Sequence, residues 1–380
     1  MVMTTRMIMG TTTGITGLEY FNGSSWVSAA AGVTIAAGAS SVLLRASIVN
    51  DTTYEGSESF SINTGSIPAG LVTNSSGASG SVTIKDDGSS SNVFLSTNIT
   101  SAPTAGSADN DTPTVSVGSV TVSEASPYAV VQVSLDKVST AAISFTPTLT
   151  SGTATVGTDT GSGLEYFNGS SWVAVTGAVT IAAGSSSVLL RTSITNDAIY
   201  EGSENFSIGT GAITGTVTNS AGTSGTITIK DDGTSANVFL GGNNTATPTT
   251  GTADNDKSTI SVSSVTVSEA SDYAVVQVSL DKVSTAAISF TPSLSSGTAT
   301  VGTDTGSGLE YFDGTHWVPV SGAVTIAAGA SSVLLRTSIT NDAVYEGSED
   351  FSIGTGAITG TVTNGAGASG TVTIKDDGSS

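Results

Sequence analysis

Acidic residues recur at matching places in this chain of 380 residues, at an interval of about 145 residues. Between residues 112 and 233 they stand in the segments VSEAS, GTATVGTD, NDAIYEGSE and IKDDG, and closely similar segments return between residues 257 and 378. Ca²⁺ binds roughly six to eight oxygen atoms from carboxylates, carbonyls and water, so loops that gather several of these acids would form a calcium site. A zinc site would instead need histidine or cysteine.

The recurring acids follow or precede short apolar runs, which places them at strand ends or in loops. In the second copy they are Glu124, Asp159, Asp197, Glu201, Glu204, Asp231 and Asp232. In the third copy they are Glu269, Asp304, Asp342, Glu346, Glu349, Asp376 and Asp377. The alternative to ion binding is that these residues only initiate turns and stay solvated.

The elements that must position these acids are predicted to be strands. The chain holds 46 glycines, only 11% of its residues are charged, and Ser, Thr and Val are abundant, which is typical of short strands joined by many turns. In AVVQVSL (129–135), Val131 and Val133 alternate with Gln132 and Ser134, as in a strand with one buried face. Runs of this kind predict an all-β fold of immunoglobulin-like β-sandwich domains.

The composition also excludes several functions. Without cysteine there is neither a disulfide framework nor a thiolate metal site. Asp and Glu outnumber Lys and Arg by 31 to 10, so nucleic acid is not an expected partner, and no apolar run is long enough for membrane insertion. His316 is the single histidine and occurs in one copy only. No histidine-based triad can therefore form, and we predict that the protein is not an enzyme.

The segment LEYFNGSSW stands at residues 18–26 and 164–172, and it returns as LEYFDGTHW at 309–317. Its Asn-Gly pair predicts a tight hairpin whose two central residues both have positive φ. The aromatic residues beside that pair are expected to pack across the hairpin, although such a cluster is also a stacking platform for a sugar. In the second copy they are Tyr166, Phe167 and Trp172.

The repeat divides the chain into five parts. We expect an incomplete copy at 1–88, a linker at 89–111, a complete copy at 112–233, a linker at 234–256 and a complete copy at 257–380. Each linker carries the apolar sequence NVFL, which we expect to dock onto a neighbouring domain. Each linker also ends in aspartates that we expect to reach the acids of the adjoining sandwich, namely Asp109, Asp111, Asp254 and Asp256.

The combination of VSE, of GTAT followed by Gly-x-Asp, of ND followed by YEGSE-x-FSI, and of a last strand ending in DDG resembles the Calx-beta domain. This family occurs in sodium/calcium exchangers and in tandem arrays of large bacterial surface proteins of the adhesin type. The resemblance implies a seven-stranded sandwich for each complete copy. In calcium-binding members the acids at one end of the sandwich hold the ion.

The resemblance implies a calcium-ligand set, carried over position by position. In the second copy it is Glu124, Asp159, Asp197, Glu201, Asp231 and Asp232, and in the third copy it is Glu269, Asp304, Asp342, Glu346, Asp376 and Asp377. In the first copy Asp51, Glu55, Asp86 and Asp87 remain. Asn196 and Asn341 stand where calcium-binding relatives often have Asp, which implies fewer or more weakly bound ions.

The first copy lacks a counterpart of residues 112 to about 157, and Thr13 stands where Asp159 stands in the second copy. Since MVMTTRMIMG is unrelated to the repeat, two strands and part of a third are expected to be missing. We favour the interpretation that the chain is a piece of a longer repeat protein. The alternative is strand addition from another copy or a neighbouring repeat, which would make a filament.

These patterns together predict a non-catalytic, extracellular or cell-surface array of calcium-binding repeats, acting as a stalk or as a surface-assembly or adhesion module. The alternatives are a strand-complemented filament subunit and a carbohydrate-binding surface protein. In the second alternative, Trp172 and Trp317 would stack against a surface glycan.

Overall fold

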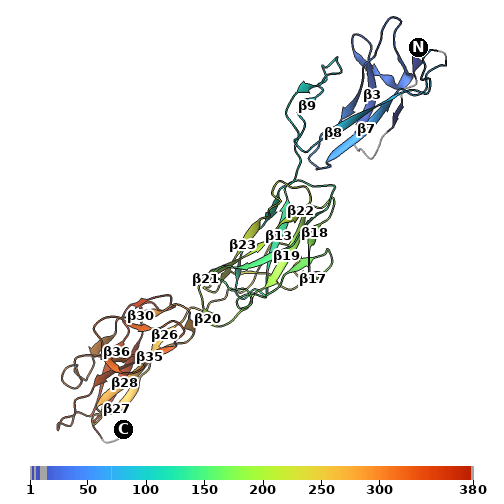
Figure 1. The fold of residues 1–380 in the computed structure, drawn as a ribbon. Coiled ribbons are helices and arrows are strands. Elements are labelled where there is room, and N and C mark those ends of the chain that lie inside the picture. Colours follow the sequence, from blue (N-terminus) through green and yellow to red (C-terminus); the bar gives the residue numbers. More distant parts are fainter. Residues whose placement is uncertain (1, 4–5, 9–14, 70, 378–380) are drawn as a thin grey trace.

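The computed structural model describes residues 2–3, 6–8, 15–69 and 71–377. Figure 1 shows three β-rich units that follow one another in an elongated row, with the two chain ends at opposite ends of the row. The described part of the chain has one short 3₁₀ helix, η1 (Ala29–Ala31), and otherwise only strands as regular structure. It contains no helix with the length and apolar character of a membrane span.

The second unit is a sandwich built from two main sheets and a small third sheet. Its sheets have the strand orders β11-β13-β19-β16-β17, β12-β23-β21-β15 and β18-β14-β22. The strands are β11 (Val115–Val117), β12 (Val120–Ser123), β13 (Tyr128–Leu135), β14 (Ile143–Phe145), β15 (Thr148–Ser151), β16 (Glu165–Phe167), β17 (Trp172–Ala174), β18 (Val179–Ile181), β19 (Ser187–Ser193), β20 (Ile199–Tyr200), β21 (Ser203–Gly209), β22 (Ile213–Thr214) and β23 (Ser224–Lys230). All ladders within the unit are antiparallel except that of β12 and β23, which is parallel.

The alternation of apolar and polar residues explains how these strands enclose a core. Val131, Val133 and Leu135 of β13 are buried, whereas Gln132 and Ser134 between them are half-buried, as the sequence predicted. Ile227 of β23 and Phe206 of β21 belong to the same buried cluster, so the inner faces of both main sheets form one core. The predicted all-β sandwich is confirmed.

The third unit repeats this arrangement, with the sheets β26-β28-β35-β32-β33, β27-β38-β36-β31 and β34-β30-β37. Its strands are β26 (Ile260–Val262), β27 (Val265–Ser268), β28 (Tyr273–Leu280), β29 (Val283–Ser284), β30 (Ile288–Phe290), β31 (Ser293–Ser296), β32 (Glu310–Phe312), β33 (Trp317–Pro319), β34 (Val324–Ile326), β35 (Ser332–Ser338), β36 (Ser348–Gly354), β37 (Ile358–Thr359) and β38 (Ser369–Lys375). It has its own core cluster, built from equivalent residues.

The first unit has only part of this framework, in the sheets β4-β3-β6, β2-β7-β8 and β1-β5. Its strands are β1 (Val2–Met3), β2 (Arg6–Ile8), β3 (Ile15–Phe21), β4 (Trp26–Ser28), β5 (Val33–Thr34), β6 (Leu44–Ile48), β7 (Ser57–Asn63) and β8 (Ser79–Lys85). Among the described residues of this unit, nothing occupies the places that β11, β12 and β13 have in the second unit.

The extent of the missing part differs from the sequence-based prediction in one respect. β1 pairs with β5 as β14 pairs with β18, and β2 pairs with β7 as β15 pairs with β21. The opening residues therefore form two strands of the unit although their sequence is unrelated to the repeat, because ladder hydrogen bonds need only backbone groups. Thr13, the predicted counterpart of Asp159, lies outside the described residues.

The Asn-Gly hairpin also differs from its prediction. Phe167 pairs with Trp172, which leaves a four-residue loop between β16 and β17. Gly169 has φ +98°, but no non-glycine residue among those described has a positive φ. The Asn168 side chain accepts the backbone N–H groups of Ser170 and Ser171, so this turn is stabilised by a side chain and needs only one residue in the left-handed region.

Each linker forms a small hairpin, and the second one docks as predicted. β24 (Asn237–Val238) pairs with β25 (Thr249–Thr250), and Phe239 after β24 is fully buried at 0% exposure. The Phe239 N–H donates to Ser126 Oγ at 2.8 Å. In the first linker, β9 (Asn92–Val93) pairs with β10 (Thr104–Ala105), yet the equivalent Phe94 is 61% exposed. The first unit has no described counterpart of the strands that cover Phe239.

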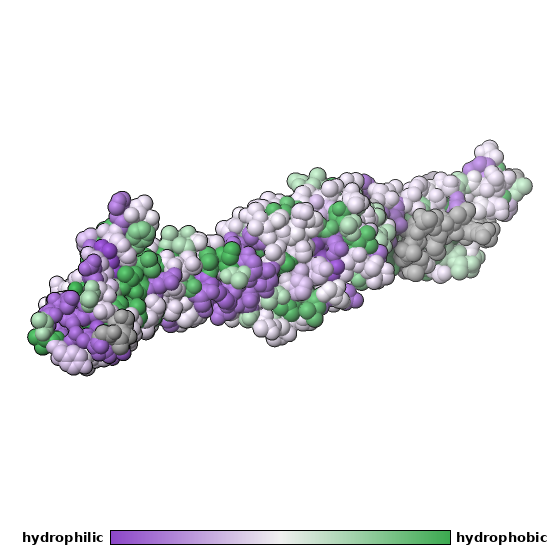
Figure 2. Space-filling model, turned by 90° about the horizontal axis from the view of Figure 1, so that it is seen from below, coloured by the Kyte–Doolittle hydropathy of each residue, from purple (hydrophilic) through white to green (hydrophobic). Residues whose placement is uncertain are grey.

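Adjacent units also touch through a turn with the sequence Tyr-Glu-Gly, which we call the YEG turn. The YEG turn of the second unit follows Ile199 in β20, and β20 pairs in parallel with β29 of the third unit. Tyr200 is only 9% exposed at this junction. The first unit meets the second in the same way, since Tyr54 bridges to Ser139. On the face shown in Figure 2, hydrophobic residues lie in separate small patches along the elongated body.

Candidate metal centre

The acids of the second unit are brought to one end of the sandwich by three segments. Asp159 lies in the turn between β15 and β16, Glu201 lies in the YEG turn, and Glu204 lies in β21. The Asp159 carboxylate accepts the Thr155 N–H at 2.6 Å, which ties the turn back on itself. The turn and β21 are distant in sequence, so only the folded sandwich places these side chains together.

Asp159, Glu201 and Glu204 form the first carboxylate group, in which one oxygen of each lies within 4.8 Å of the others. Burial, together with the neighbouring acids, raises the pKa of Glu204 to about 7. The same causes, burial first and then the charges of Asp159, Asp197 and Asp231, raise the pKa of Glu201. The fold therefore holds these carboxylates close together, although their mutual repulsion would separate them if they were free in water.

Asp231, which follows β23, fixes the YEG turn. Its carboxylate accepts the Glu201 N–H at 2.6 Å and the Gly202 N–H at 3.1 Å. Gly202 has φ +85°, a conformation that favours glycine and lets the turn approach the carboxylate. Asp231 is itself buried, and burial raises its pKa despite these hydrogen bonds.

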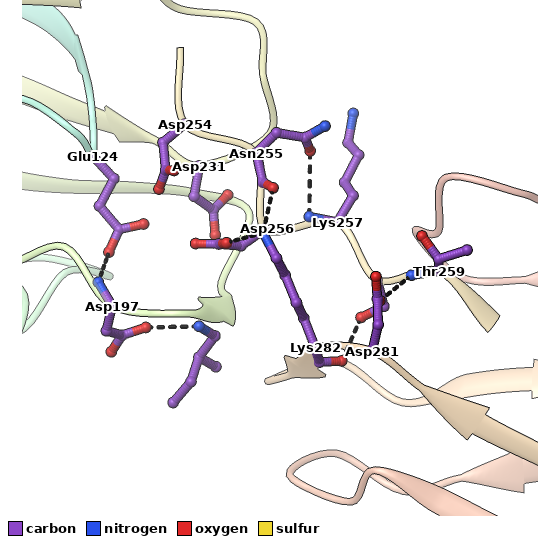
Figure 3. A network of polar contacts seen from close by, with 12 residues as sticks. Glu124, Asp197, Asp231, Asp254, Asn255, Asp256, Lys257, Thr259, Asp281 and Lys282 are labelled. Carbon is purple, nitrogen blue, oxygen red and sulfur yellow. Dashed lines mark hydrogen bonds and ion pairs between the residues drawn. The ribbon is translucent and has the colours of Figure 1, made fainter. Parts of the chain in front are cut away.

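Glu124, Asp254 and Asp256 form the second carboxylate group, again with one oxygen of each within 4.8 Å of the others. Glu124 follows β12 and is only 5% exposed. Its pKa is raised to about 8, by burial first and then by the charges of Asp231, Asp254 and Asp197. Figure 3 shows the carboxylates of Glu124, Asp231, Asp254 and Asp256 directed toward a common space.

A small cavity of about 10 Å³ lies between the first carboxylate group and Glu124, and its lining includes Glu124, Asp159, Glu201, Glu204 and Asp231. A space of this size is on the scale of a single water molecule or a small ion. The polar atoms of its acidic lining are oxygen acceptors, so the cavity is suited to a cation.

The third unit reproduces the first group in Asp304, Glu346 and Glu349, again within 4.8 Å. Asp304 accepts the Thr300 N–H at 2.6 Å, and Asp376 accepts the Glu346 N–H at 2.9 Å, as Asp159 and Asp231 do in the second unit. Burial first, and then the charges of Asp304 and Glu346, raise the pKa of Glu349. Glu269, which corresponds to Glu124, accepts the Asp342 N–H at 3.0 Å.

Several predicted ligands lie beside these groups rather than in them. Asp197 donates its N–H to Glu124, and its carboxylate accepts the Ile199 N–H at 2.7 Å. Asp232 accepts hydrogen bonds from Thr234, which lower its pKa although burial opposes them, and lies 3.8 Å from Lys230. In the third unit, Asp342 accepts the Val344 N–H and Asp377 lies 3.8 Å from Lys375.

The remaining acids of the first unit form no group of three within its described part. Asp86 accepts the Glu55 N–H at 2.6 Å, as Asp231 does with Glu201. Asp51 accepts the Thr53 N–H, and Asp87 accepts from Ser89 and lies 3.5 Å from Lys85. Without described counterparts of Glu124 and Asp159, these acids do not converge.

Glu204 and Glu349 belong to the carboxylate groups but were not among the predicted ligands. Both follow the YEG turn at a spacing of three residues from its glutamate. Glu204 is half-buried at the start of β21 and shares its strand face with the core residue Phe206, so its carboxylate lies at the end of the sandwich core, where it meets Glu201 of the YEG turn. Their recurrence in the sequence was the available signal.

The aromatic cluster of the second unit is packed rather than open. Phe167 and Trp172 have ring centroids 5.5 Å apart. The Arg191 guanidinium lies 4.3 Å from the Trp172 ring and 3.9 Å from the Tyr128 ring. Trp172 Nε1 donates to the Asn243 carbonyl oxygen of the linker at 3.0 Å. The linker and the arginine thus contact the residues that would stack on a sugar.

A profile of the Calx-beta domain matches residues 17–88, 107–233 and 252–378, which together make up most of the chain. The chain belongs to the Calx-beta domain family. The third Calx-beta match begins before the second linker ends, so Asp254 and Asp256 fall within it. The second carboxylate group therefore contains residues from two Calx-beta matches.

Several solved structures resemble this Calx-beta array. CBD12 from CALX1.2 is 14% identical with a TM-score of 0.26, and the match covers 70% of this chain and 100% of that one. The apo form of the Calx CBD1 domain is 19% identical with a TM-score of 0.22, over 31% of this chain and 98% of that one. The CupB6 tip adhesin from Pseudomonas aeruginosa is 12% identical with a TM-score of 0.25, over 70% and 99%. No curated protein matches the chain significantly.

Proposed function

We propose that each complete Calx-beta unit of this protein binds Ca²⁺ at its acidic end, and that the array is a non-catalytic, calcium-stabilised stalk or assembly module at a cell surface. The observation that carries the proposal is a repeated arrangement. Asp159, Glu201 and Glu204 in one unit, and the equivalent three acids in the next, converge within 4.8 Å. The convergence of equivalent acids in two units, from segments distant in sequence, supports ion binding over solvated turn acids.

The side chains present fit a hard cation. The first carboxylate group and Asp231 offer only oxygen atoms, and burial together with mutual repulsion raises the pKa values of Glu201, Glu204 and Asp231. Asp159, Glu201 and Glu204 would hold the ion, with Asp231 fixing the YEG turn that carries Glu201. The ion would supply the positive charge that offsets this repulsion.

The stalk role is supported by the arrangement of the units. They follow one another in an elongated row, and both junctions use the same YEG turn and the same linker residues. A tandem array whose neighbours dock by a repeated contact is suited to spacing or assembly rather than to a single deep binding site. The adhesin-type context of such arrays is the setting that we propose for this chain.

Calcium titration tests the ion-binding part of the proposal. Extracellular calcium modules bind with Kd of about 10⁻⁴ to 10⁻³ M, so calorimetry and thermal melting should be followed up to about 10⁻² M Ca²⁺. Glu204→Gln should remove most of the calcium stabilisation of the second unit, and Glu349→Gln most of that of the third. Asp313→Asn is the matched control, because the other two copies have Asn at this place. Identical wild-type melting curves in chelator and in calcium would refute ion binding.

The location is tested separately. Antibodies against residues 112–380 should label intact cells that produce the full protein, and external protease should remove the signal. Labelling that requires permeabilised cells would contradict the cell-surface role while leaving ion binding intact.

A further inference from the structure

The second carboxylate group lies on the boundary between two units. Glu124 follows β12 of the second unit, whereas Asp254 and Asp256 precede β26 of the third. Backbone contacts hold them there, since the Asp256 N–H donates to the Asp231 carbonyl oxygen at 2.8 Å and the Asp254 N–H donates to Ser123 Oγ at 2.9 Å. Figure 3 shows the three carboxylates meeting from the two sides of the junction.

The side chain of Asp256 indicates that protein groups alone do not satisfy this cluster. Asp256 is 3% exposed, and its Oδ1 pairs with Lys282 Nζ of the third unit. Its Oδ2 is buried and has no hydrogen-bond partner, and the same holds for Oδ2 of Asp254. A buried carboxylate oxygen without a partner is costly. Lys282 is the one cation that pairs with this group within the described residues, against several buried acids.

We infer that Glu124, Asp254 and Asp256 form a divalent-cation site shared by the second and third units, separate from the group of Asp159, Glu201 and Glu204. The inference rests on the proposed calcium function and extends it, because here the ligands come from two neighbouring domains. Ca²⁺ fits the all-oxygen donor set. An ion held from both sides restricts the angle between the two units.

The first junction is a natural control for this site. One backbone contact recurs there, because the Asp111 N–H donates to the Asp86 carbonyl oxygen at 2.7 Å, and Lys137 Nζ pairs with Asp111 at 2.9 Å as Lys282 does with Asp256. However, Asp109 and Asp111 belong to no group of three acids in the described part of the chain. The first unit has no described counterpart of Glu124. Calcium should therefore restrict the second junction and not the first.

The experiment uses the full chain, which contains no cysteine. Spin labels at Thr176→Cys and Ser321→Cys span the second junction at equivalent exposed positions, and labels at Ala30→Cys and Thr176→Cys span the first. Pulsed electron resonance then measures each distance distribution in chelator and in Ca²⁺. We expect Ca²⁺ to narrow the distance distribution across the second junction only. We also expect calorimetry to show one bound ion in addition to those held by Asp159, Glu201 and Glu204 and by their three counterparts in the third unit.

Three variants separate the site from its surroundings. Asp254→Asn with Asp256→Asn, and independently Glu124→Gln, should abolish the narrowing and remove one bound ion, while calcium still stabilises the third unit through Asp304, Glu346 and Glu349. Glu124→Gln leaves the Lys282 ion pair intact, so it controls for loss of that pair. The equivalent pair Asp109→Asn with Asp111→Asn should leave both measurements unchanged.

Two outcomes would overturn the inference. If the variants keep the wild-type ion count and distance distributions while calcium still stabilises the units, the shared site is wrong and the proposed function stands. If wild-type protein binds no Ca²⁺ in any unit, both are wrong.

Discussion

The backbone N–H of Asp256 donates to the carbonyl oxygen of Asp231 at 2.8 Å, which attaches the start of the third unit to the last strand end of the second. Asp111 and Asp86 make the same contact one repeat earlier, at 2.7 Å. The chain therefore follows one path at both junctions. The difference between the junctions lies in side chains, because Glu124 faces the second junction and the first has no described equivalent.

Calcium should stabilise the second unit through Glu204. An ion that binds only the folded state adds roughly 2.7 kcal/mol at a hundredfold excess over Kd, and Glu204→Gln should remove most of that gain. Each unit has one tryptophan, so Trp26→Phe with Trp317→Phe leaves Trp172 as a fluorescence reporter of the second unit. An unchanged calcium-dependent shift of the Trp172 transition in Glu204→Gln would exclude Glu204 as a ligand.

Stability without calcium should fall as the pH rises. The pKa of Glu124 is raised from its ordinary value of 4.5 to about 8 in the folded chain, and that of Glu204 to about 7. A raised carboxyl pKa means that the folded state binds the proton more tightly than the unfolded state does. The stability that this proton binding contributes is fully present below about pH 4.5 and is lost as the pH rises toward 8. The melting temperature of the second unit in chelator should decrease across this window.

Calcium and Glu124→Gln provide the checks on this pH dependence. Saturating Ca²⁺ should reverse or flatten the decrease, because the ion replaces the proton as the partner of the carboxylates. Glu124→Gln should weaken the pH dependence in chelator. A melting temperature that rises from pH 5 to pH 8 in chelator would contradict the assignment.

Removing the Phe239 side chain should destabilise the second unit and release its linker. Truncating a fully buried phenylalanine costs about 3–5 kcal/mol, and Phe239 is packed into the core of the second unit. Phe94→Ala is the matched control, since this equivalent residue is largely exposed, and it should change stability by less than about 0.5 kcal/mol. Urea unfolding measures the free energy of unfolding of both variants. Trp172 fluorescence follows the second unit after removal of the Phe239 side chain, and Trp26 fluorescence follows the first unit in Phe94→Ala. Equal effects would show that the two linkers dock alike.

Alanine should be tolerated at Gly80 and not at Gly225, although the two glycines occupy equivalent places. A Cβ on Gly225 would lie 2.0 Å from the carbonyl oxygen of Gly118, whereas a Cβ on Gly80 would meet nothing within 4 Å. Gly225→Ala should cost about 1–3 kcal/mol through overpacking. Hydrogen exchange and thermal melting of both variants test this difference. Strong destabilisation by Gly80→Ala would indicate that another segment covers β8 in solution.

The repeat, the strand faces and the positions of the acids could be predicted from the sequence because they depend on local patterns. Alternation in β13 decides which side chains are buried, and turn residues mark where each strand ends. The family resemblance added the expectation that acids from separate loops meet at one end. The YEGSE motif and the linker aspartates also stand out in the sequence, because both recur.

The sequence by itself determined an all-β tandem array whose acids stand at strand ends. Only the tertiary structure decided which acids converge: Glu204 joins Asp159 and Glu201, whereas Asp232 turns to Thr234 and Lys230. It also decided that Val2–Met3 and Arg6–Ile8 enter the sheets and that Asp256 lies buried at a junction. The physical reason is that local sequence sets the direction of a side chain, while convergence depends on how strands distant in sequence pack together.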